Sequence, residues 1–169
     1  YSEILLQIIL SNILNSKSLD SSILLLIKIC NENNLIVTQF LLNIDYSILS
    51  CEVLIRLGKI FKLIEDKMSL FTYLSKYLTD IKNNKFCLAL FSLLSVLVIS
   101  ETSENSNVLA ERYSNILKIC FEILKSKGKN QALILYGICT FINVLYEKVP
   151  SLIPTFLDET SEILIPFLL

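Results

Sequence analysis

The chain of 169 residues contains no histidine, and it has only three glycines and three prolines. Without histidine it cannot build a Ser-His-Asp or Cys-His catalytic group, a histidine zinc site, or the general base most often used near neutral pH. The scarcity of glycine and proline leaves little material for tight β-turns. Long helices are the structure that this composition favours.

Neither charge sign dominates. Fifteen basic residues stand against sixteen acidic ones, which gives a net charge of −1, and the basic residues are scattered along the chain. A nucleic-acid-binding protein usually shows a basic cluster or stripe. We therefore expect no direct nucleic-acid partner.

The sequence is unusually apolar, with 53% hydrophobic residues and a mean hydropathy of +0.62, against roughly 45–50% in an average soluble domain. The longest uncharged runs, 86–100 and 131–146, are shorter than the roughly 20 residues that cross a bilayer. We interpret them as buried core helices and expect no transmembrane segment. No secretory signal is visible, and the sequence is expected to begin inside a longer chain.

The five cysteines lie in apolar helical stretches, far apart in the sequence and without CxxC spacing: Cys30, Cys51, Cys87, Cys120 and Cys139. Thiols in such surroundings usually act as small core residues. They are expected to be buried and unpaired, in a reducing compartment such as the cytosol or the nucleus.

Apolar periodicity and polar breaks predict nine helices and no strand. Their expected ranges are 2–14, 21–30, 35–42, 46–64, 69–79, 85–100, 107–125, 130–148 and 151–169. Taken in pairs, these helices start a new hairpin about every 33 to 44 residues. This spacing is close to the ~40-residue period of HEAT and armadillo repeats. The predicted fold is therefore an all-α solenoid of antiparallel helical hairpins of the HEAT/armadillo type, an α-α superhelix. Residues 1–169 would form a single segment of about four and a half repeats within a longer chain.

Motifs for catalysis or cofactor binding are missing from the sequence. The three glycines are isolated and form no phosphate-binding loop. Two adjacent carboxylate pairs, Glu65-Asp66 and Asp158-Glu159, fall at predicted helix starts or ends, where acidic side chains commonly cap helices. We predict no catalytic, cofactor or metal residue and no enzyme.

One polar stripe stands out on the otherwise apolar helix predicted at 130–148. Tyr136, Thr140, Asn143 and Glu147 follow the spacing i, i+4, i+7 and i+11, which places them on one face. They form either a solvated edge or a partner-binding surface, and they are the candidate partner-binding residues. A similar stripe, Glu52, Arg56 and Lys59, is typical of ion pairs on a helix surface.

The end of the chain, 141–169 (FINVLYEKVPSLIPTFLDETSEILIPFLL), resembles the second helix of one HEAT repeat, the turn and the first helix of the next in the importin-β (karyopherin-β) nuclear transport receptors. Residues 2–9 and 109–117 are similar to pieces of the early repeats of these receptors. The resemblance implies a protein-binding scaffold for cargo and a Ran-type GTPase, in the cytoplasm and the nucleus.

A second, local resemblance competes with the first. Segments 63–65, 71–74 and 80–84, followed by Ala89-Leu90 and Leu93-Leu94, look like part of the HEAT-repeat scaffold of the complex that makes phosphatidylinositol 3,5-bisphosphate. It implies a scaffold of a membrane-trafficking or phosphoinositide-kinase complex, which remains the alternative function.

Overall fold

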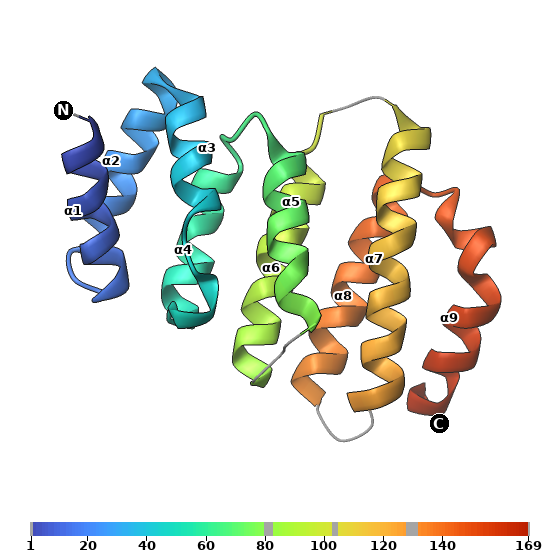
Figure 1. Cartoon of the computed structure of the whole chain (residues 1–169). Helices are drawn as coiled ribbons and strands as arrows, with labels where there is room; N and C mark the ends of the chain where they lie inside the picture. Colours follow the sequence, from blue (N-terminus) through green and yellow to red (C-terminus); the bar gives the residue numbers. More distant parts are fainter. Residues whose placement is uncertain (1, 80–82, 103–104, 128–131, 169) are drawn as a thin grey trace. The chain divides into compact units, whose positions relative to one another are not determined.

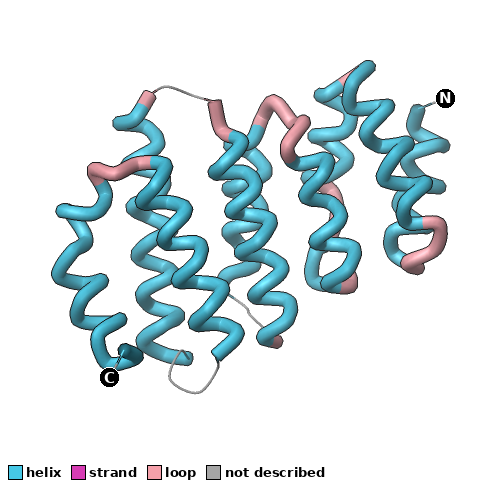
Figure 2. The backbone as a smooth tube through the Cα atoms, turned by 180° about the vertical axis from the view of Figure 1, so that it is seen from behind, coloured by secondary structure: helices cyan, strands magenta, loops and turns pink. Residues whose placement is uncertain are grey.

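The computed structural model describes residues 2–79, 83–102, 105–127 and 132–168, and these ranges contain only helices, turns and loops (Figure 1, Figure 2). The prediction of an all-α chain is therefore confirmed for the described residues. The chain divides into two compact units, residues 1–81 and 82–169. Each unit has its own set of packed helices.

The first unit contains five α-helices and two short 3-10 helices among its described residues. They are α1 (Ser2–Leu14), α2 (Leu19–Glu32), α3 (Asn34–Leu42), η1 (Tyr46–Ile48), α4 (Cys51–Phe61), α5 (Lys67–Ser75) and η2 (Lys76–Thr79).

Helix α2 is the centre of this unit, because it packs against α1, α3 and α4, while α3 also packs against α5. Leu26, Val37, Leu54 and Phe61 are fully buried where these helices meet. Helices α2 and α3 thus each contact both a neighbour in sequence and the next helix but one.

Polar residues mark where the helices of the first unit begin. The side chains of Asn33, Ser50 and Asp66 accept hydrogen bonds from backbone N–H groups in the first turns of α3, α4 and α5. Such N-caps satisfy donors that have no partner within the helix. Asn34 adds a long-range link: its Nδ2 donates to the carbonyl of Leu63 at 2.8 Å, and its Oδ1 accepts from the backbone N–H of Glu65 at 3.0 Å.

The single helix predicted at 46–64 is wrong. The chain forms η1, then passes through Leu49 and Ser50 in extended conformation, and begins α4 only at Cys51. The cause is the burial of Tyr46, which is 0% exposed. Its Oη donates to the carbonyl of Leu41 at 2.8 Å, and its ring lies edge-on to other aromatic rings. These contacts hold the α3–α4 connection in its shape, and the N-cap Ser50 is the local signal in the sequence for the start of α4 at Cys51.

Two further tyrosines complete this cluster. Tyr73 donates its hydroxyl to the carbonyl of Ile44 at 2.9 Å, and the hydroxyl of Tyr77 accepts from the backbone N–H of Tyr46 at 3.2 Å. We call Tyr46, Tyr73 and Tyr77 the tyrosine cluster. Through these hydrogen bonds the tyrosine cluster links the α3–α4 connection to α5 and η2. The connection therefore does not continue as one helix into α4.

Among its described residues, the second unit contains four longer helices: α6 (Asn84–Ser100), α7 (Ser106–Lys127), α8 (Ala132–Lys148) and α9 (Leu152–Leu168). Its most extensive contact joins α6 to α8, and α7 packs against both α8 and α9. The rings of Phe91 on α6 and Phe141 on α8 have centroids 5.3 Å apart. The two apolar runs that raised the membrane alternative therefore form one packed helix pair.

Most predicted boundaries lie within two residues of the observed ones. Helix α1 has the bounds predicted for it, while α2 begins two residues earlier than expected, so Asp20 lies inside its first turn rather than before it. Residues 130 and 169, where two helices were expected to begin and end, lie outside the described residues.

We predict that Tyr46→Phe lowers the free energy of unfolding by about 1–2 kcal/mol, because it leaves the buried carbonyl of Leu41 without its donor. The measurement is urea unfolding followed by circular dichroism. Tyr136→Phe is the matched control, since that side chain is 65% exposed. Equal stability of the two variants would contradict a supporting role for the Tyr46 hydroxyl.

Candidate functional site

The predicted partner-binding stripe lies together on α8. Tyr136, Thr140, Asn143 and Glu147 are all exposed. The Thr140 hydroxyl donates to the carbonyl of Tyr136 at 2.8 Å, and Asn143 Nδ2 donates to Glu147 Oε1 at 3.0 Å. We call these four residues the α8 stripe. The α8 stripe exposes an aromatic ring, an amide and a carboxylate. These groups can form both apolar contacts and hydrogen bonds with another protein.

The opposite side of α8 is fixed by close packing on α6. A Cβ atom added to Gly137 would lie 3.3 Å from Leu88 Cδ1 and 3.6 Å from Leu88 Cα. The absence of a side chain at Gly137 thus lets the two helices approach closely. The α8 stripe is therefore carried by a helix that packs closely on α6.

A polar cluster that the sequence did not reveal lies at the C-terminal ends of α6 and α8. Lys148 Nζ donates to the carbonyl of Glu101, and Arg112 Nη1 lies 3.8 Å from Glu101 Oε2. The side chains of Glu101 and Arg112 are each only 15% exposed. Burial, together with the charge of Glu101, raises the pKa of Tyr113 to about 12, so this phenol stays neutral. The cluster joins α6, α7 and α8, and because its members are far apart in sequence, no short motif announces it.

The second predicted stripe forms ion pairs, as expected. Arg56 on α4 pairs with Asp20 on α2 and, at 2.9 Å, with Glu52 one turn away. The Asp20 contact, between two helices, was not predicted. Lys59 is exposed. Exposed pairs of this kind add little stability, and these residues carry no catalytic arrangement.

Of the two adjacent carboxylate pairs, only Glu65-Asp66 has the helix-capping role expected from the sequence. Asp66 is the N-cap of α5 and also accepts a hydrogen bond from the Ser69 hydroxyl at 2.6 Å. Asp158 and Glu159 are exposed on α9, inside the helix rather than at its first turn. In the part of the chain that the structure describes, no three cysteine or acidic side chains come together in a way that could hold a metal ion.

The five cysteines are free thiols, and they differ in exposure. Cys30, Cys87 and Cys120 are buried, as expected, whereas Cys51 and Cys139 are half-buried. Burial raises the pKa of the Cys120 thiol far above its usual range and also raises the pKa of Cys139. Since the thiolate is the nucleophile, neither thiol is activated for chemistry.

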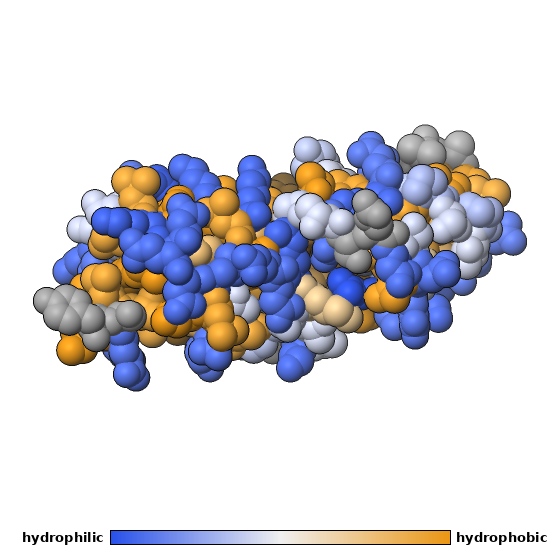
Figure 3. Space-filling model, turned by 90° about the horizontal axis from the view of Figure 1, so that it is seen from above, coloured by the Kyte–Doolittle hydropathy of each residue, from blue (hydrophilic) through white to orange (hydrophobic). Residues whose placement is uncertain are grey.

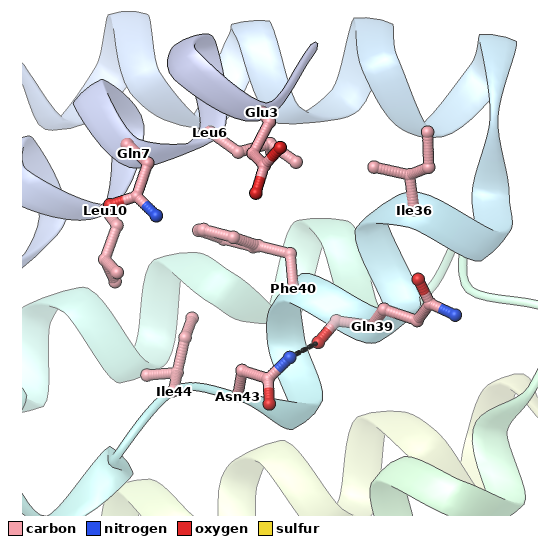
Figure 4. A pocket seen from close by; sticks show the side chains of 9 residues that line it. All are labelled: Glu3, Leu6, Gln7, Leu10, Ile36, Gln39, Phe40, Asn43 and Ile44. Carbon is pink, nitrogen blue, oxygen red and sulfur yellow. Dashed lines mark hydrogen bonds between the residues drawn. The ribbon is translucent and has the colours of Figure 1, made fainter.

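A pocket of about 440 Å³ opens between α1 and α3 (Figure 4). No motif in the sequence predicts it. Four of its residues come from α1 at spacing i, i+3, i+4, i+7, and three come from α3. Asn43, the C-cap of α3, continues the same spacing, and Ile44 follows in the loop. Its lining consists of Glu3, Leu6, Gln7, Leu10, Ile36, Gln39, Phe40, Asn43 and Ile44. We call it the α1–α3 pocket.

Hydrophilic and hydrophobic side chains are interspersed on the face shown in Figure 3. Among the described helices, none reaches the combination of length and apolar composition that crossing a bilayer requires.

Comparison with known proteins gives no relative for this chain: no protein-family model, no curated protein and no solved structure matches it significantly. Functional proposals for this chain therefore rest on its own sequence and structure.

We predict that the half-buried Cys51 and Cys139 react with iodoacetamide in the folded protein at least about tenfold faster than Cys30, Cys87 and Cys120, which react only when the core opens. Because the pKa of Cys139 is raised, its rate should reach half-maximum at a higher pH than in the urea-unfolded chain. Mass spectrometry of digests between pH 7 and 10 measures both. Uniform labelling of all five thiols would contradict the described core.

Proposed function

We propose that this chain is a segment of a HEAT/armadillo-type helical solenoid that acts as a protein-binding scaffold and has no catalytic role. In its most concrete form, it is part of an importin-β-like nuclear transport receptor that binds cargo and a Ran-type GTPase and works in both cytoplasm and nucleus.

The observation that carries the proposal is the order in which the helices pack. In the first unit α2 packs on α4 and α3 on α5, and in the second unit α6 packs on α8 and α7 on α9. Contacts between a helix and the next helix but one, seen for these four helix pairs, are what stacked hairpins produce, since each hairpin lays its two helices against the corresponding helices of its neighbour. A bundle of four helices around one axis has no reason to repeat this pattern twice.

The α8 stripe is the proposed partner-binding surface. Protein interfaces are enriched in tyrosine, because its ring provides a large contact area and its hydroxyl a hydrogen bond. Tyr136 lies exposed on a helix whose opposite side is closely packed, so binding would order few additional groups. Asn143 and Glu147 are already joined by a hydrogen bond, which fixes their orientation before a partner arrives.

Importin-β receptors are preferred over the alternative because the segments that resemble them, 2–9, 109–117 and above all 141–169, are distributed over the chain. The alternative scaffold of a trafficking or phosphoinositide-kinase complex is supported by residues 63–94 alone. The two functions differ in one measurable property: only a transport receptor should distinguish the nucleotide state of a Ran-type GTPase.

We predict that the full-length protein binds a Ran-type GTPase loaded with a non-hydrolysable GTP analogue at least about tenfold more tightly than the GDP form, as measured by isothermal titration calorimetry. The double variant Tyr136→Ala/Asn143→Ala should weaken the binding of a partner that uses the stripe about tenfold, which corresponds to about 1.4 kcal/mol.

Asn115→Ala is the control, since Asn115 is an exposed amide on α7 away from the stripe. Equal binding of the two nucleotide states would overturn the transport-receptor proposal. If Asn115→Ala weakened partner binding as much as the double variant, the assignment of the α8 stripe would be wrong.

A further inference from the structure

We infer that the α1–α3 pocket binds a small amphipathic organic cation, a molecule with an apolar body and one protonated amine. This site belongs to the first unit and does not depend on the scaffold function proposed for the chain.

The pocket exists because α1 and α3 both pack on α2 but make no comparable contact with each other within the described residues. Leu6 and Leu10 on α1 therefore remain half-buried, as do Ile36 and Phe40 on α3. Apolar side chains that the fold leaves uncovered gain free energy when a ligand removes them from water. The volume of about 440 Å³ is in the range of small-molecule sites.

Glu3 sets the charge of the ligand. It is the one charged residue in the lining, and it forms no ion pair with another described residue. Figure 4 shows its carboxylate pointing down toward the ring of Phe40. A carboxylate favours a cation, and an aromatic face attracts the same cation through its quadrupole. An anion of equal size would meet the repulsion of Glu3.

One amide at the rim, that of Gln7, can add a hydrogen bond to an ammonium group. The amide of Gln7 points toward Phe40 in Figure 4, on the same side as Glu3. Asn43 Nδ2 donates to the carbonyl of Gln39 at 2.9 Å, which holds the Asn43 side chain in place. In Figure 4 the Asn43 amide oxygen points away from Glu3 and Phe40, so the hydrogen bonds of the ammonium group come from Glu3 and Gln7.

The dimensions favour a free small molecule over a protein partner. Glu3 and Leu10 are seven residues apart, so the α1 wall is about 10 Å long at the helical rise of 1.5 Å per residue. A stable protein interface usually buries about 800 Å² on each partner. Two helical turns facing two others provide much less, whereas a phenylalkyl group fits within this length.

The test uses three compounds with one apolar body: 4-phenylbutylammonium, 4-phenylbutanol and 4-phenylbutyrate. Each is titrated into the chain with isotope-labelled leucine and isoleucine methyl groups and followed by NMR. We expect the ammonium compound to shift the methyl signals of Leu6, Leu10 and Ile36 and to bind about fivefold more tightly than the alcohol. The carboxylate compound should bind most weakly of the three.

Glu3→Gln should remove this preference, so that the ammonium compound and the alcohol bind equally, with the affinity for the alcohol unchanged. Glu3 is exposed, so its replacement should not disturb folding. Glu32→Gln, at the exposed end of α2, is the matched control and should keep the preference.

Phe40→Leu keeps an apolar side chain but removes the aromatic ring. It should lower the affinity for the ammonium compound about threefold more than the affinity for the alcohol. The inference is overturned if the pocket methyl groups do not shift at millimolar ligand, if the three compounds bind equally, or if Glu32→Gln has the effect of Glu3→Gln. It is also overturned if exposed apolar residues elsewhere, such as Leu133 and Leu157, shift to the same extent.

Discussion

The fold depends on the burial of helices along more than one side. Helix α6 illustrates this, because nine of its seventeen residues are buried, including adjacent pairs such as Leu93-Leu94 and Leu97-Val98 that point to different sides of the helix. A helix packed on one neighbour needs a single apolar stripe, whereas a helix between two neighbours needs a wider one. Each fully buried leucine or phenylalanine contributes about 1.5–3 kcal/mol. The high mean hydropathy of the chain follows from this packing and calls for no membrane.

The polar clusters lie where this apolar packing is interrupted. Asn34 links the start of α3 to the loop before α5, the tyrosine cluster holds the α3–α4 connection, and Glu101 joins the ends of α6 and α8 to α7. At these places backbone N–H and carbonyl groups leave regular helices and are removed from water, so each needs a partner. Side chains from distant elements provide those partners. Polar contacts therefore define the connections of each unit, while apolar contacts hold its helices together.

The sequence predicts most of the helices, since their period and caps are local properties. The N-cap role of Asp66 and the ion pair of Glu52 with Arg56 could be inferred because each involves residues three or four positions apart. The break at Leu49-Ser50 has one local signal, the N-cap Ser50, but the contact of Tyr46 with Tyr77 that holds it joins residues 31 positions apart and could not be inferred. The α1–α3 pocket could not be predicted either, because it forms where α1 and α3 do not pack closely on each other, and local sequence patterns do not show which helices pack together. The position of the α8 stripe on one exposed face was predictable from its spacing, but its role as a binding surface stays a prediction.

Both proposed binding sites depart from the rule that helices packed between neighbours bury apolar side chains on more than one side. One site has polar residues on such a helix, and the other has apolar residues that stay uncovered. The α8 stripe places polar side chains on a helix whose neighbours require apolar ones, so these residues contribute nothing to the core and are free to vary with a partner. The α1–α3 pocket leaves apolar side chains uncovered where the rule would bury them, and it adds a carboxylate that no described cation neutralises. In both cases the residues that deviate are not needed for the core, so their chemistry is available to a ligand. In this chain the most informative residues for function are therefore those that the requirements of the core do not explain.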